Sequence, residues 1–148
     1  MRPRSFARPP DPVPPITGVA HVELSVSDLE RSVEWYCRLL GARDVYRNRN
    51  DELGFTACAI LEPASRTVLA FTQHDVVEGS GFTPHRVGLD HLSFAVPDRA
   101  ALEVWQARLD ELGIAHDAID DQGFAVALNL RDPDGIALEF YFLQRRAV

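Results

Sequence analysis

The stretch GVAHVELSVSD (residues 18–28) returns 70 residues later as GLDHLSFAVPD (residues 88–98). The two stretches share a glycine at the start, a histidine at the fourth position and an aspartate at the end. Trp35 and Trp105 follow at the same offset. Self-similarity at a fixed offset is typical of a duplicated structural unit. We therefore expect two copies of one unit in the chain.

Each copy has the pattern of one strand, one helix and three further strands. Residues 19–26 alternate between apolar and other side chains, which predicts a strand, and residues 29–40 have apolar side chains at helical spacing. Asp28 is a suitable N-cap for this helix, and Gly41 is a suitable stop. In the second copy Asp98 and Gly113 take these places. The further strands are expected at 44–49, 55–61 and 67–73 in the first copy, and at 115–119, 124–130 and 136–142 in the second.

The predicted fold class is α+β, with two tandem βαβββ modules. One module has a single helix on its sheet, so its concave face stays open unless a second module closes it. We expect the pair to form an incompletely closed eight-stranded barrel with the helices outside. The modules can pair within one chain or between two chains. The predicted divisions are a Pro-rich arm (1–16), module 1 (17–75), a linker (76–87), module 2 (88–143) and a tail (144–148).

Charge and hydropathy exclude two classes of partner. The formal net charge of −7 argues against a protein that binds nucleic acid by neutralising phosphates. Apolar runs fall short of the ~20 residues that a membrane helix needs, and no apolar segment of a signal peptide follows the N-terminal arginines. We expect a cytoplasmic protein that binds neither nucleic acid nor membrane.

Ligand-type side chains fall on the face of each sheet that is expected to point inward. Period two places His21 and Glu23 on the inward face of the first strand, His91 on its repeat, and Glu139 and Tyr141 on that of the last strand. Two imidazoles and one carboxylate suit a transition metal and leave coordination positions free for a substrate. We therefore predict a divalent-metal site made of His21, His91 and Glu139. Glu23 and Tyr141 are the candidate catalytic acid, base or hydrogen-bond donor.

Three stretches resemble the vicinal oxygen chelate superfamily, which includes glyoxalase I, extradiol dioxygenases and bleomycin-resistance proteins. They are AHVELSVSDLERSVEWYCRLLG, LDHLSFAVPD and RDPDGIALEFY, and the resemblance covers residues 17–143. It implies paired βαβββ modules and a metal bound from the first and last strands of each module. The ligands then map to His21, His91 and Glu139. Ala70 stands where glyoxalase-like members carry a fourth ligand, so the three-ligand set is closer to that of extradiol dioxygenases, with iron or manganese favoured over zinc or nickel.

The resemblance leaves several activities open. The extradiol dioxygenase pattern carries a tyrosine where this chain has Asn129, and a histidine where residues 120–122 have none. A metal-free drug-resistance protein of the bleomycin-resistance type is one alternative. A lyase or isomerase that takes a fourth ligand from water or from His74 is another. The favoured prediction is a metal-dependent, dioxygenase-like enzyme that acts, as a homodimer, on a small substrate with vicinal oxygens.

Overall fold

The structure is a computed structural model that describes residues 13–79 and 81–144. It confirms two βαβββ modules in tandem. Most of the predicted arm and nearly all of the predicted tail lie outside the described residues. Module 1 consists of β1 (Val22–Ser25), α1 (Leu29–Leu40), β2 (Arg43–Asn50), β3 (Phe55–Leu61) and β4 (Val68–His74). Module 2 consists of β5 (Leu92–Ala95), α2 (Arg99–Leu112), β6 (Asp120–Asp121), β7 (Ala125–Arg131) and β8 (Ala137–Leu143).

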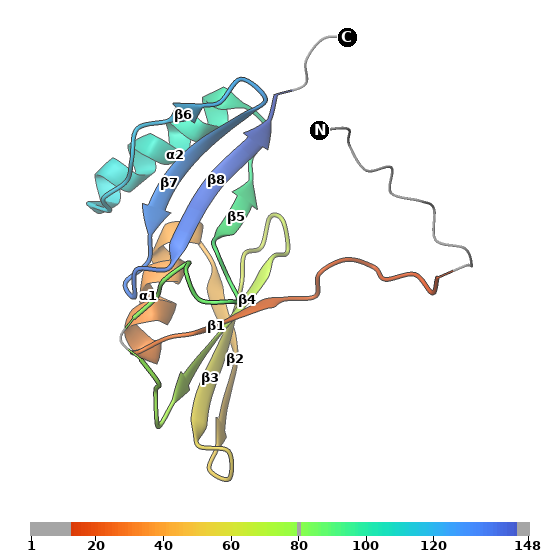
Figure 1. The fold of residues 1–148 in the computed structure, drawn as a ribbon, viewed down its shortest axis with the longest axis vertical. Helices are drawn as coiled ribbons and strands as arrows, with labels where there is room; N and C mark the ends of the chain where they lie inside the picture. Colours follow the sequence, from red (N-terminus) through yellow and green to blue (C-terminus); the bar gives the residue numbers. More distant parts are fainter. Residues whose placement is uncertain (1–12, 80, 145–148) are drawn as a thin grey trace.

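Each module forms its own four-stranded mixed sheet. The strand order is β1-β4-β3-β2 in module 1 and β5-β8-β7-β6 in module 2. The first strand of each module runs parallel to the last one, and the other neighbours are antiparallel. Within the described residues no strand pairing joins the two sheets. The modules follow one another along the long axis of the molecule, and α1 and α2 lie on the same side of it (Figure 1).

The helices begin and end where the sequence predicts. The Asp28 side chain accepts a hydrogen bond from the backbone N–H of Arg31, and the Asp98 side chain accepts one from Ala101. Gly41 and Gly113 end the helices in the left-handed conformation, with φ of 64° and 68°. Such φ values favour glycine because a Cβ atom would crowd the backbone. None of the described helices is both long and apolar enough to cross a bilayer.

One predicted strand is wrong in place and length. A strand was expected at 115–119, but β6 follows this segment and has only two residues. His116 forms an isolated bridge with Leu130, whereas Asp120 pairs with Ala127, so one extra residue interrupts the ladder between these points. This extra residue is a β-bulge, and it interrupts the regular pairing with β7 that a continuous strand at 115–119 would make. Five strands match the prediction to within one residue at either end: β2, β3, β4, β7 and β8. The first strand is shorter than predicted, because β1 begins at Val22 instead of residue 19 and leaves His21 just before it.

The two modules share one apolar core. Tyr36 of α1 is fully buried, and its ring lies 4.7 Å from that of Phe71 in β4. In module 2 Trp105 of α2 stacks on Phe140 of β8 at a centroid distance of 4.1 Å. Buried side chains of both modules form a single continuous cluster. Apolar packing therefore helps to hold module 2 against module 1.

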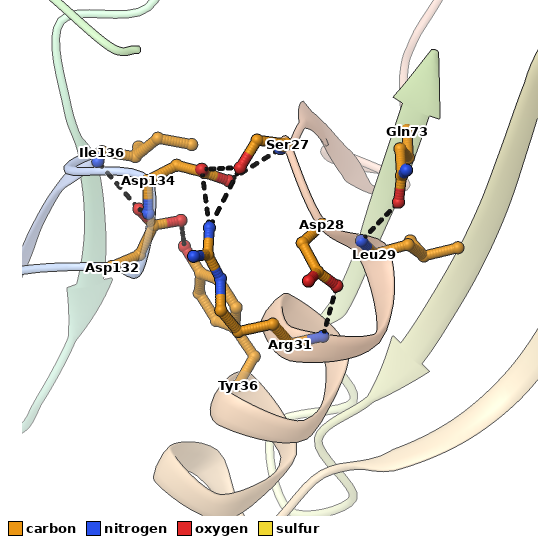
Figure 2. Close-up of polar contacts among 9 residues, drawn as sticks. All are labelled: Ser27, Asp28, Leu29, Arg31, Tyr36, Gln73, Asp132, Asp134 and Ile136. Carbon is orange, nitrogen blue, oxygen red and sulfur yellow. Dashed lines mark hydrogen bonds and ion pairs between the residues drawn. The ribbon is translucent and has the colours of Figure 1, made fainter. Parts of the chain in front are cut away.

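Polar contacts fix the β7–β8 turn of module 2 on α1 of module 1 (Figure 2). The Tyr36 hydroxyl donates a hydrogen bond of 3.0 Å to the buried carboxylate of Asp132. The Asp134 carboxylate accepts hydrogen bonds from the backbone N–H of Ser27 and from the Arg31 guanidinium, at 2.9 and 3.0 Å. These contacts join the end of β1 and the start of α1 to the turn that leads into β8.

Candidate functional site

The structure brings together two of the three predicted metal ligands, His91 and Glu139. His91 immediately precedes β5, and Glu139 lies in β8, which pairs with β5 in parallel. The distance between His91 Nε2 and Glu139 Oε1 is 3.4 Å. The other ring nitrogen of His91, Nδ1, lies 2.6 Å from Asp90 Oδ1. An ionised carboxylate can only accept a hydrogen bond, so Nδ1 carries the proton and donates it to Asp90.

This arrangement of His91 fits a bound cation. With the proton on Nδ1, a neutral ring presents the Nε2 lone pair to the Glu139 carboxylate, and two electron-rich atoms then face each other. Only a proton or a metal ion between them relieves this repulsion. The Glu139 side chain is only 15% exposed, and in the described part of the chain no hydrogen-bond donor other than His91 reaches it. A histidine whose second nitrogen is held by a carboxylate is also the common form of a metal-binding histidine.

The same contacts shift the pKa of His91 upward. The largest cause is the hydrogen bond to Asp90, and the charge of Glu139 acts in the same direction, against the opposing effect of partial burial. A proton and a metal compete for Nε2, because only the neutral ring binds a metal. Metal binding at this pair should therefore weaken as the pH falls.

The third predicted ligand, His21, pairs with a different carboxylate. It immediately precedes β1, and its Nε2 lies 3.9 Å from Glu23 Oε2. Both side chains are about half exposed, at 52% and 45%. The other carboxylate oxygen of Glu23, Oε1, accepts a hydrogen bond from the hydroxyl of Thr72 in β4. Module 1 therefore also presents an imidazole beside a carboxylate.

The two pairs stand apart in a single chain. Among residues 13–79 and 81–144, no three metal-binding side chains lie close enough together to hold one ion. One member of each pair, His91 and Glu23, also borders a different hollow. A cavity of about 600 Å³ is lined by His91 and the β7–β8 turn, and one of about 420 Å³ is lined by Glu23, His74 and part of the linker.

The remaining candidate residues lie in module 2 near Glu139. Tyr141, a predicted catalytic residue, follows Glu139 by two residues in β8 and so shares its face; it is partly buried. Asn129 of β7 lies directly opposite Glu139 in the antiparallel ladder. Tyr141 along β8 and Asn129 across the ladder are therefore both neighbours of Glu139 in the sheet.

The sequence reasoning missed the polar partners of the two pairs. Asp90 was given no role, although it directly precedes His91 and the repeat has Ala20 in the equivalent place. Thr72 of β4 was given no role either, and its contact with Glu23 depends on the parallel pairing of β1 and β4. An acidic residue next to a candidate ligand was a signal for the first partner. No signal along the chain pointed to the second.

Comparison with known proteins places this geometry in a family. Residues 18–140 match the model of the Glyoxalase/Bleomycin resistance protein/Dioxygenase superfamily. The chain is 33% identical over 131 residues to a catechol-2,3-dioxygenase of Bacillus subtilis (strain 168) and 30% identical over 129 residues to a biphenyl-2,3-diol 1,2-dioxygenase 3 of Rhodococcus globerulus. These matches cover 84% and 82% of this chain, but only 41% and 60% of the relatives.

A solved structure agrees in both fold and sequence. It is a glyoxylase/bleomycin resistance protein/dioxygenase domain from Frankia sp. EAN1pec, with 33% identity and a TM-score of 0.78. The alignment covers 88% of this chain and all of that domain. Family match, sequence identity and fold agree with the resemblance seen in the repeated stretches. The chain therefore belongs to the Glyoxalase/Bleomycin resistance protein/Dioxygenase superfamily, that is, the vicinal oxygen chelate superfamily.

Proposed function

We propose that this chain is a divalent-metal enzyme with a dioxygenase-like ligand set, acting on a small molecule with two neighbouring oxygens. The observation that carries the proposal is the opposed pair of His91 Nε2 and Glu139 Oε1, at 3.4 Å, between which a metal ion could take the place of the proton. The names of the two relatives, which specify catechol and a 2,3-diol, support the substrate class. Iron or manganese are the favoured metals, since both accept mixed imidazole and carboxylate ligands.

The roles of the side chains follow from their positions. His21, His91 and Glu139 would hold the metal. A divalent ion there would act as a Lewis acid on the two substrate oxygens. Tyr141 shares the face of Glu139 and would donate a hydrogen bond to a bound substrate. Glu23, next to His21, would accept a proton from the substrate.

A second copy of the chain would complete the site. His21 stands apart from His91 and Glu139 in one chain, and within the described residues no strand of one sheet pairs with a strand of the other. Beside β1, the cavity of about 420 Å³ also carries exposed apolar side chains, which a partner would cover: Val76, Val77, Val87 and Leu89. In the proposed homodimer, His21 of one protomer meets His91 and Glu139 of its partner.

Metal analysis tests the proposed site. The protein is purified without chelators, reconstituted with Fe(II), Mn(II), Zn(II) or Ni(II), and analysed for bound metal. We expect about one ion per chain in the wild type, and a loss of binding in His91→Ala and Glu139→Ala. His85→Ala is the matched control, because this exposed histidine lies in the linker. Oxygen uptake with catechols follows if iron or manganese binds. A wild type that holds none of these metals would refute the proposal and favour a metal-free binding protein.

Mixing two defective variants tests whether the site is shared between chains. His21→Ala and His91→Ala are co-expressed with different tags, and the mixed dimer is isolated. A shared site leaves one intact ligand set in each mixed dimer, so half of the wild-type metal should return. A site within one chain leaves both sets broken, and no metal should return.

A further inference from the structure

The two modules carry their acidic side chains on opposite members of an equivalent strand pair. In module 2 the parallel register of β5 and β8 pairs Ser93 with Glu139. In module 1 the register of β1 and β4 pairs Glu23 with Ala70. Each pair thus contains one carboxylate and one small residue, but the carboxylate lies on the last strand in module 2 and on the first strand in module 1.

We propose that Glu23 supplies the metal ligand that Ala70 cannot supply, so that the complete site has four protein ligands. The inference rests on the proposed metal site and goes beyond it, because it changes Glu23 from a proton acceptor into a ligand. Neighbouring strands are about 4.8 Å apart. Moving a carboxylate from position 70 to position 23 therefore displaces its origin by one strand spacing, which a flexible glutamate side chain can span.

The distances within the two modules support the same role for both carboxylates. His21 Nε2 and Glu23 Oε2 are 3.9 Å apart, against 3.4 Å between His91 Nε2 and Glu139 Oε1. In both modules the nitrogen that faces the carboxylate is Nε2, and the histidine immediately precedes the first strand. Each module therefore offers one imidazole and one carboxylate on the same face of its sheet.

Thr72 holds the Glu23 carboxylate in the orientation that a ligand needs. Thr72 lies two residues after Ala70 on the same face of β4 and is 7% exposed. Its hydroxyl donates a hydrogen bond to Glu23 Oε1. The other oxygen, Oε2, is left on the side of His21. A carboxylate with one oxygen anchored and the other free is typical of metal ligands that are oriented by a neighbouring hydrogen bond.

Charge balance also favours a fourth ligand. Glu23 and Glu139 together carry two negative charges, which match a divalent cation bound by two neutral histidines. With three ligands, the Glu23 carboxylate would stand beside the site without contacting the cation, although in the described part of the chain its only ion-pair partner is His21. A bound divalent cation would be the largest local charge in such a site and would attract the Glu23 carboxylate.

The test moves the carboxylate across the strand pair. Mn(II) affinity is measured by titration calorimetry, metal content by elemental analysis, and the Mn(II) ligand environment by electron paramagnetic resonance. The variants are Glu23→Ala, Glu23→Gln and the double variant Glu23→Ala with Ala70→Glu. Glu34→Ala is the matched control, since this exposed glutamate lies on α1. Circular dichroism checks that each variant is folded, and Glu23→Gln keeps the size of the side chain in case alanine disturbs β1.

We expect Glu23→Ala and Glu23→Gln to weaken Mn(II) binding by about 10- to 100-fold or more, the range seen when even an outer partner of a ligand is lost. The double variant should recover most of this loss and restore the resonance spectrum, and Glu34→Ala should bind as the wild type does. Unchanged Mn(II) affinity in Glu23→Ala, with binding abolished in His91→Ala, would overturn the ligand role while the proposed metal site stands. A wild type without metal would instead refute the proposed function itself.

Discussion

Removing one hydroxyl group tests how the two modules are held together. Tyr36 of module 1 and Asp132 of module 2 are 0% and 6% exposed, and the hydroxyl donates to Asp132 Oδ2 at 3.0 Å (Figure 2). The substitution Tyr36→Phe deletes the donor and keeps the ring, so the packing against Phe71 is preserved. The change in stability then reports the hydrogen bond and no new cavity.

The expected loss follows from the partners of the Asp132 carboxylate. Its Oδ1 accepts the backbone N–H groups of Asp134 and Ile136, each at 2.8 Å, whereas Oδ2 has the Tyr36 hydroxyl. Tyr36→Phe therefore leaves a buried carboxylate oxygen without its donor. Hydrogen bonds to charged groups contribute about 1.5–3 kcal/mol. For a chain of this size, that loss lowers the melting temperature by roughly 3–12 °C.

Urea unfolding followed by circular dichroism at pH 7 measures this loss, at one fixed protein concentration because a dimer would make stability depend on concentration. Tyr46→Phe is the matched control, since Tyr46 is 60% exposed and should change the unfolding free energy by less than about 0.5 kcal/mol. Asp132→Asn completes a double-mutant cycle with Tyr36→Phe. Equal stability of the Tyr36→Phe and Tyr46→Phe variants would show that the hydrogen bond does not hold the modules together.

Four further outcomes follow from the structure. Burial raises the pKa of Asp132, so its contribution to stability is present below the unfolded pKa of about 3.9 and is lost as the pH rises through the folded pKa. The stability of the wild type relative to Asp132→Asn should therefore decrease from pH 4 to pH 7 in urea titrations, and a constant difference would contradict this. Asp28→Ala removes the N-cap of α1 and should cost about 1 kcal/mol of unfolding free energy, with Asp28→Ser as the control that keeps the cap. Gly113→Ala should cost about 1–2 kcal/mol through its φ of 68° alone, because an added Cβ meets no atom within 4 Å; no loss in urea unfolding would contradict the left-handed C-cap. Mn(II) at 100 times its dissociation constant should raise the unfolding free energy of the wild type by about 2.7 kcal/mol. A similar rise in the unfolding free energy of His91→Ala would show that the ion binds at a site without His91.

The parts of the fold that depend on neighbouring residues could be predicted from the sequence. An aspartate before an amphipathic run and a glycine after it fixed both ends of α1 and α2. The β3 strand, Phe55–Leu61, has the predicted bounds because polar turns flank it on both sides. The repeat at an offset of 70 residues predicted the second module from the first. In each case the deciding interactions lie within a few residues along the chain.

The errors and omissions concern contacts between distant residues. The extra residue that displaces β6 is visible only when the segment is paired with β7. Tyr36 and Asp132 are 96 positions apart, and neither residue predicts the other. The placement of one module against the other depends on many such contacts, each weak on its own. The sequence could therefore predict the modules but not their docking.

The candidate site shows the same limit. Alternation predicted that His21 and Glu23 share one face, and in the structure their side chains lie 3.9 Å apart; the repeat assigned His91 the equivalent place. Alternation says nothing about which residue of a neighbouring strand lies opposite. The register that pairs Glu23 with Ala70, and so suggests a displaced carboxylate, appears only in the three-dimensional structure.

The docking of the modules and the candidate site use the same two strands. Ser27, which donates to Asp134, follows β1, and β1 carries Glu23. The turn that contains Asp134 leads directly into β8, which carries Glu139. Both turns are closed by a carboxylate that accepts N–H groups of its own turn, Glu62 in module 1 and Asp132 in module 2. Among the described residues, only the module 2 turn also makes side-chain hydrogen bonds to the other module. The two turns therefore make different contacts within the described residues, and in the same part of the chain His21 stands apart from His91 and Glu139. This asymmetry is the structural reason to look for the missing symmetry between two chains.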